Sequence, residues 1–176
     1  MTEAEFSRLV RLDQVGAGES AHAVHAEDGE RAALAARFAL PSVDALDAHF
    51  TLRRDAAGVL ARGHLSARVV QSCVVTGDPV PATVEEDFLI RFLPEPREGE
   101  EDEIELTEEE CDTVFFTGGA IDLGEAAAET LALALDPFPR SAGAAQALKD
   151  AGVISEEEAG PFGALAGLRD RLGGAK

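Results

Sequence analysis

The stretch from residue 59 to residue 93 alternates between apolar and polar side chains, and this pattern constrains the fold more than any other part of the chain. Alternation with a period of two is typical of strands with one buried face. The parity of the apolar positions changes at residues 77–78, which predicts an antiparallel hairpin with its turn centred there. Such a turn would place Arg68 opposite Asp87. The apolar positions are odd before the turn and even after it: Val59, Ala61, Leu65, Ala67, Val69 and Cys73, then Val80, Ala82, Val84, Phe88, Ile90 and Phe92.

Alternation elsewhere predicts further strands, with a helix between two of them. Apolar residues at every second position indicate strands within residues 6–12, 20–26 and 46–52. Asp28 supplies a helix start with an acidic first turn. Pro41 ends this helix, because the residue before a proline leaves the helical region. The long hairpin is therefore expected to belong to a larger sheet.

A second helix is predicted after residue 121. Asp122 can accept hydrogen bonds from the first backbone N–H groups, and Glu125 can reach back as in a capping box. The helix is apolar around most of its circumference, which predicts that it is covered on more than one side. Pro137 ends it, and beyond residue 140 the composition becomes rich in glycine and alanine.

These elements predict the α+β class, with an antiparallel β-sheet built around the long hairpin, packed helices and a C-terminal helical tail. We expect a single domain over residues 1–139, with an acidic loop at 95–112. Residues 140–176 are expected to form a linker and an apolar tail. A compact chain of this size buries roughly 70% of its unfolded surface, so no metal or disulfide is needed for folding.

The charge is strongly acidic and unevenly distributed. The chain has 34 acidic residues against 15 basic ones, a formal net charge of -19. Eleven of the acidic residues, with one arginine, lie within residues 95–112. Such a block is either a solvated loop or a surface that attracts a strongly basic protein. In both cases the chain lacks the clustered Lys and Arg that wrapping nucleic acid phosphates requires.

The chain carries no sign of a membrane or a secretory route. No apolar run approaches the roughly 20 residues of a membrane helix, and the first residues lack the basic and apolar regions of a signal peptide. Cys73 and Cys111 make no disulfide framework. We expect a cytoplasmic protein with free thiols and no membrane contact.

No catalytic residue, metal site, cofactor or small-molecule substrate is predicted. Cys73 lies on the apolar face of the hairpin, where a thiol stays protonated, so we assign it a structural role. His22 and His25 fall on opposite faces of a strand and cannot share a metal. Pairs of carboxylates are frequent in acid-rich loops, so their spacing indicates no general acid or base.

Three separated segments together are similar to one known family. They are VQSCVVT at 70–76 with FLIRF at 88–92, IDLGE at 121–125 followed by LALALDPFP at 131–139, and PFGAL at 161–165. These segments resemble the YceD-like family, whose members are large ribosomal RNA subunit accumulation proteins. The resemblance implies a bacterial cytosolic protein needed for normal accumulation of large-subunit ribosomal RNA, with no established catalytic activity.

The resemblance also has a departure. Many relatives carry a Cys-x-x-Cys pair in the hairpin, whereas Cys73 is followed three positions later by Thr76. A zinc site needs more thiolate or imidazole ligands than this turn supplies, so none is expected here.

We therefore expect a non-enzymatic factor that supports accumulation, processing or stability of large-subunit ribosomal RNA. The favoured hypothesis is an acidic adaptor that binds a basic ribosomal or rRNA-processing protein, so that contact with the RNA is indirect. The alternative is a direct RNA binder with a small basic sheet face formed by Arg62, His64 and Arg68. Asp122, Gly124 and Glu125 either cap a helix or form a turn that a partner reads. The candidate partner-binding residues are Asp122, Gly124, Glu125, Pro137, Phe138, Pro139, Pro161, Phe162 and Leu165.

Overall fold

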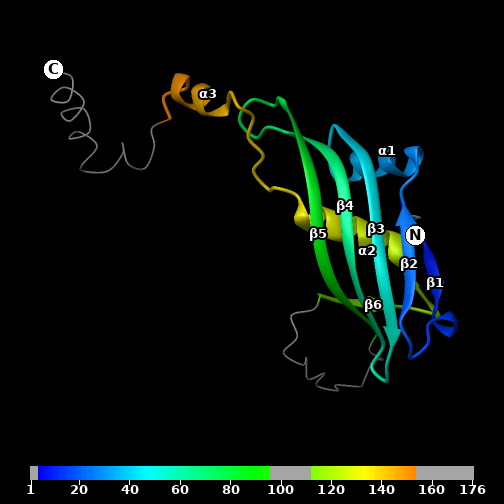
Figure 1. Ribbon diagram of the computed structural model, residues 1–176. Helices are drawn as coiled ribbons and strands as arrows, with labels where there is room; N and C mark the ends of the chain where they lie inside the picture. The colour runs from blue at the N-terminus through cyan, green and yellow to red at the C-terminus, as the bar shows by residue number, and fades with distance from the viewer. Residues whose placement is uncertain (1–3, 96–111, 154–176) are drawn as a thin grey trace, which may run out of the picture. The chain divides into compact units, whose positions relative to one another are not determined.

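The structure is a computed structural model of residues 1–176, and it describes residues 4–95 and 112–153 (Figure 1). The chain divides into two compact units. The main unit comprises Met1–Gln71 and Pro81–Pro137, and the turn unit comprises Ser72–Val80 and Phe138–Lys176. The domain boundary expected near residue 140 stays a prediction.

The main sheet has five strands in the order β2-β3-β4-β5-β6 (Figure 1). The β2–β3 and β3–β4 pairs are antiparallel, whereas β5 and β6 are parallel, with Ile90 opposite Asp112. A parallel pair needs a crossover of about a dozen residues or more, and the acidic segment between the two strands has that length. The strands are β2 (Ser20–His25), β3 (Ser42–Arg54), β4 (Val59–Ser72), β5 (Pro79–Pro94) and β6 (Asp112–Phe116).

The remaining elements confirm the α+β class. A second sheet pairs β1 (Leu9–Arg11) with β7 (Ala120–Asp122), and Val10 lies opposite Ile121. A short 3-10 helix, η1, spans Leu12–Gln14. The main unit contains helices α1 (Asp28–Arg37) and α2 (Leu123–Ala134), and the turn unit contains the C-terminal helix α3 (Ala144–Asp150).

One face of the main sheet, here called the inner face, carries the core. Leu46, Leu65 and Leu131 are each 0% exposed, and α2 crosses this side of the sheet (Figure 1). Full burial of a leucine contributes roughly 1.5–3 kcal/mol relative to exposure, so this face supplies most of the driving force for folding. The opposite face, here called the outer face, is not covered by any helix of the described main unit (Figure 1).

The hairpin is present, but the predicted register is wrong by four residues. The Cys73 N–H donates to the Asp78 carbonyl oxygen at 2.8 Å, so the loop is centred within residues 74–77 rather than on 77–78. His64, not Arg68, lies beside Asp87. Because four is an even number, each side chain keeps its predicted face.

A side-chain network explains the longer loop. Thr76 Oγ1 donates to Asp78 Oδ2 at 2.6 Å, and Gly77 adopts a positive φ of 76°. Glycine takes this conformation without steric cost. The loop is therefore closed by a threonine and an aspartate, and alternation alone carries no information about such a closure.

Candidate functional site

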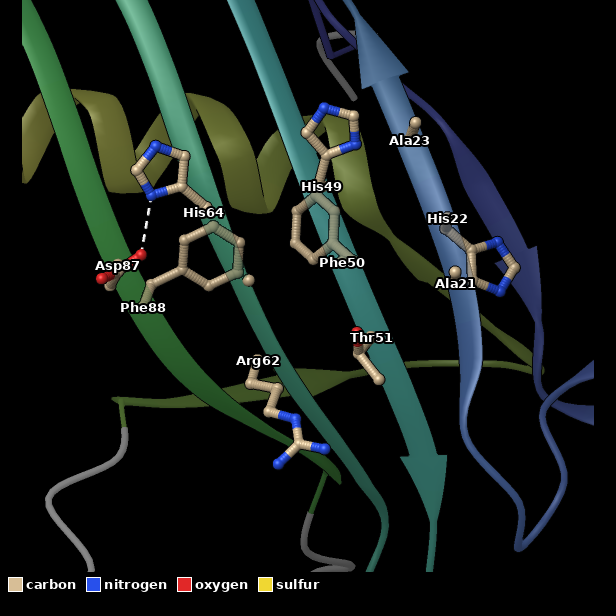
Figure 2. A pocket seen from close by; sticks show the side chains of 11 residues that line it. Ala21, His22, Ala23, His49, Phe50, Thr51, Arg62, His64, Asp87 and Phe88 are labelled. Atoms are coloured by element: carbon tan, nitrogen blue, oxygen red, sulfur yellow. Dashed lines mark hydrogen bonds and ion pairs between the residues drawn. The ribbon is translucent and has the colours of Figure 1, made fainter.

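The outer face holds a shallow hollow of about 630 Å³ over the middle of the sheet (Figure 2). Strand pairing sets His49 opposite His64 and Thr51 opposite Arg62. Because successive strand residues alternate between faces, these four side chains belong to the outer face. Two of the three residues predicted to form a basic face, Arg62 and His64, therefore line this hollow.

Gly63, which lines the hollow, has a packing reason to be glycine. Gly63 lies opposite Phe50 in the sheet, and the Phe50 and Phe88 ring centroids are 4.9 Å apart at an interplanar angle of 56°. A Cβ at Gly63 would approach the Phe88 ring within 2.5 Å. The tilted aromatic pair occupies the space that a side chain on the inner face would need, so glycine is required at this position.

The cationic groups around the hollow already have carboxylate partners. His64 Nδ1 lies 2.7 Å from Asp87 Oδ1, and His64 Nε2 lies 2.9 Å from Glu85 Oε2 (Figure 2). Hydrogen bonds that the Asp87 carboxylate, and then the Glu85 carboxylate, accept from the ring raise the pKa of His64 above its ordinary value. Arg62 forms an ion pair with Glu19. The positive charge of this surface is therefore largely compensated.

The same pairing continues along the sheet. Ser66 Oγ donates to Glu85 Oε1 at 2.8 Å, and this hydrogen bond, together with that of His64, lowers the pKa of Glu85. His25 Nδ1 lies 2.7 Å from Asp47 Oδ1. Arg68 is exposed, and no hydrogen bond or ion pair joins it to another described residue. The predicted basic face thus contains one uncompensated guanidinium beside two compensated groups.

Asp122 forms the N-cap of α2, as the capping alternative predicted. Its Oδ1 accepts from the Gly124 and Glu125 N–H groups at 3.0 and 3.2 Å, and from the Arg8 N–H at 2.7 Å. Glu125 does not reach back to complete a capping box; it forms an ion pair with Arg37 of α1 at 2.6 Å. These contacts account for Asp122 and Glu125 within the fold, and their role in partner recognition stays a prediction.

Gly124 is buried where α2 meets the N-terminal segment. A Cβ there would lie 2.6 Å from the Phe6 carbonyl oxygen and 3.0 Å from the Arg8 nitrogen. Any larger side chain would have to push backbone atoms apart, so glycine permits the close approach of the two segments. Packing therefore explains this glycine, and recognition by a partner stays a prediction for it as well.

The turn unit contains Cys73, whose side chain is 3% exposed. The Thr76 N–H donates to Cys73 Sγ at 3.4 Å. Hydrogen bonding by Ser141, and then by Thr76, lowers the pKa of Cys73 to about 6. These hydrogen bonds outweigh burial, which alone would raise the pKa of the thiol, and the structural role expected for Cys73 stays a prediction.

The described residues contain no group of three or more His, Cys, Asp or Glu that could hold a metal ion. Cys111 lies outside the described residues. His22 and His25 both lie on β2, three positions apart, so their side chains point to opposite faces of the sheet as predicted.

The remaining predicted partner-binding residues differ in exposure. Pro137 is exposed, and Phe138 is 69% exposed. Pro139 is buried, and its carbonyl oxygen accepts from the Val74 N–H at 2.9 Å. Pro161, Phe162 and Leu165 lie outside the described residues, as does the acidic segment at 96–111.

Sequence reasoning missed Leu133 as an exposed residue. It predicted that α2 is covered on more than one side, but Leu133 is 79% exposed, although Leu131 is fully buried. Residues two positions apart in a helix lie about 200° apart around its axis, because a helix has 3.6 residues per turn. The position of Leu133 relative to Leu131 was therefore a signal in the sequence that could have predicted its exposure. Leu133 borders a second hollow of about 230 Å³ beside β5.

No helix in the described part of the chain is long and apolar enough to cross a membrane.

A protein-family model described as "Large ribosomal RNA subunit accumulation protein YceD" matches residues 61–169, which is more than half of the chain. No curated protein and no solved structure matches the chain. The matched region begins at residue 61, within β4, and includes the rest of the hairpin, β6, β7, α2 and α3.

Proposed function

The chain belongs to the YceD family, and we propose that it is a non-enzymatic factor that supports accumulation of large-subunit ribosomal RNA in the bacterial cytoplasm. The family description names this RNA and no catalytic activity. We propose further that the protein acts as an acidic adaptor, which binds a basic ribosomal or rRNA-processing protein and influences the RNA indirectly.

The pairing of cations on the outer face is the observation that carries the adaptor proposal. Arg62 and His64 are engaged by Glu19, Glu85 and Asp87. RNA phosphates would have to compete with these carboxylates. The chain as a whole has a net charge of -19, which repels a polyanion and attracts a basic protein over long range.

The adaptor would use the acidic segment at 95–112 for attraction and apolar residues for close contact. Steering by unpaired charge raises association rates and weakens as salt screens it, with a Debye length of about 8 Å at physiological ionic strength. Phe138, which is 69% exposed, is the described aromatic residue among the predicted apolar contacts. Phe162 and Leu165 are proposed to add to it.

Capture of basic proteins by the purified full-length chain tests this proposal. The immobilised chain is exposed to proteins extracted from large ribosomal subunits, at about 50 and 500 mM salt. We compare it with a variant in which residues 95–110 are replaced by an equally long neutral Gly/Ser segment. This replacement keeps the connection between β5 and β6 while it removes the charge.

We expect the chain to retain a basic protein at low salt, with affinity falling by at least about tenfold at high salt or after the replacement. An affinity that is the same at both salt concentrations would overturn electrostatic capture. A loss caused by replacement alone, without salt dependence, would contradict it as well, because charge would not be the cause.

Direct RNA binding is the second candidate, and the exposed Arg68 is the observation that favours it. A gel shift with large-subunit ribosomal RNA distinguishes the two candidates. The adaptor proposal expects little binding by the purified chain, and no difference for the Arg62→Glu, Arg68→Glu double variant. A shift that the double variant abolishes would favour direct binding.

A further inference from the structure

On its β6 side, most of β5 lacks a neighbouring strand among the described residues. β5 extends from Pro79 to Pro94, but its pairing with β6 involves only Ile90–Pro94 (Figure 1). A strand with one neighbour presents alternate N–H and C=O groups on its open side. Residues 81–89, the main-unit part of this open edge, therefore offer a ready template for one more strand.

A small hollow, lined by both apolar and carboxylate side chains, lies directly beside the open edge. It has a volume of about 230 Å³, and Phe88 and Leu89 of β5 line it together with Leu133 of α2. Leu133 is 79% exposed and is the most exposed large apolar side chain in the described part of the chain. The hollow is large enough for one or two side chains, and too small for a whole helix.

Carboxylates surround this hollow. Glu86, Asp87 and Asp112 line it with the apolar groups. Asp87 is shared with His64, whereas Glu86 and Asp112 are exposed and form no ion pair with another described residue. A hollow lined by both apolar side chains and carboxylates is complementary to a segment that carries lysine or arginine around an apolar side chain.

The same charges disfavour pairing of this edge with a second copy of the chain. Two copies would bring two chains of net charge -19 together and would set like carboxylates near one another. Natural proteins place charges on edge strands to prevent such self-association. Here the charges have one sign, so they repel a copy of this chain and still attract a basic strand.

We propose that residues 81–89 of β5 bind an extended basic segment of a partner protein, which adds a strand to the sheet. An apolar side chain of this segment enters the hollow beside Leu133, and flanking lysine or arginine side chains pair with Glu86 and Asp112. Backbone hydrogen bonds to β5 supply affinity, and the hollow supplies selectivity. The inference rests on the adaptor function and gives that adaptor a specific docking edge.

A labelled peptide of alternating lysine and valine is the probe. Its binding to the full-length chain is measured by fluorescence anisotropy and compared with the same peptide N-methylated at every second amide. N-methylation removes the donors of one peptide edge and leaves the charge unchanged. We expect it to weaken binding by at least about tenfold, because several backbone hydrogen bonds are lost.

Two matched variants test the hollow. Leu133→Ser removes the apolar side chain from the hollow without changing the charge, and Leu9→Ser makes the same change at another site where leucine is 70% exposed. We expect Leu133→Ser to weaken peptide binding by about tenfold and Leu9→Ser to weaken it by less than about twofold. Because both leucines are exposed, neither change removes a core side chain.

Amide hydrogen exchange supplies a second readout. The inference expects the peptide to slow exchange within residues 81–89. Equal binding of the two peptides, equal effects of the two variants, unchanged exchange at 81–89, or no binding at low salt would each overturn it. If basic ribosomal proteins are captured but these tests are negative, the proposal of docking at the β5 edge fails and the adaptor function stands. If the peptide protects 81–89 and no ribosomal protein is captured, the adaptor function fails and the edge site stands.

Discussion

The two faces of the main sheet differ in how their side chains are satisfied. The inner face carries fully buried leucines such as Leu46 and Leu65, and α2 crosses this side of the sheet (Figure 1). The outer face carries histidine and arginine paired with carboxylates, as in His64 with Asp87 and Arg62 with Glu19. The inner face is therefore responsible for folding, and the outer face consists mainly of compensated charges.

This difference shows which groups of the sheet are still available to bind a ligand. Surface ion pairs contribute only about 0–1 kcal/mol each, but they occupy the donors that an RNA ligand would need. The open edge of β5 has unpaired backbone groups in addition to the exposed Leu133. An uncovered sheet face alone is thus weak evidence for a nucleic acid surface, and the pairing of its cations decides the interpretation.

Neighbouring residues on β4 and β3 give the largest expected contrast between the faces. Leu65→Ala removes a side chain that is 0% exposed, and we expect the free energy of unfolding to fall by about 2–5 kcal/mol. His49→Ala, at an exposed outer-face position, should change it by less than about 0.5 kcal/mol. Urea unfolding of both variants measures the contrast, and similar losses would contradict the division into two faces.

Gly63→Ala tests whether the packing of the Phe50–Phe88 pair requires a glycine on β4. The new Cβ would lie 2.1 Å from the His49 carbonyl oxygen and 2.5 Å from the Phe88 ring. We expect a loss of about 1–3 kcal/mol in the free energy of unfolding, because the ring and backbone must shift. Gly18→Ala is the matched control, since no atom lies within 4 Å of a Cβ there. Equal stability of the two variants would show that the Phe50–Phe88 pair does not require a glycine.

The smallest expected effect concerns the charge state of His64. Asp87 and Glu85 raise its pKa in the folded chain, so its contribution to stability is complete below the unfolded pKa of about 6.5 and is lost as the pH rises through the folded pKa. Asp87→Asn should lower the His64 pKa towards its ordinary value. An NMR titration of the histidine ring checks this, with exposed His49 as the internal reference. An unchanged His64 pKa would contradict the ion pair.

The sequence predicts which face each strand residue occupies, but it does not predict the register of the hairpin. Hydrophobic alternation determines the face, because a one-residue slip would expose the whole apolar set. A shift by four preserves that pattern. The observed register depends on the loop closed by Thr76 and Asp78, whose hydrogen bond is a three-dimensional detail. The α2 start was predictable because Asp122 caps it locally, whereas the Glu125–Arg37 pair joins helices far apart in the chain.

The candidate site was less predictable for the same reason. Arg62 and His64 are correctly placed together by strand spacing, but their carboxylate partners come from other segments. The lowered pKa of Cys73 depends on Ser141, which lies beyond α2 in the chain. Long-range pairing decides these properties, and local periodicity does not contain it.

The ratio of large- to small-subunit ribosomal RNA in cells depleted of this protein tests the central claim most directly. Depleted cells are complemented with the wild-type chain or with the Arg62→Glu, Arg68→Glu variant, and precursor ends are mapped. We expect depletion to lower the large-subunit species selectively, and both chains to restore the ratio, because the proposed adaptor does not need the outer-face cations. A ratio that depletion leaves unchanged would contradict the proposed function.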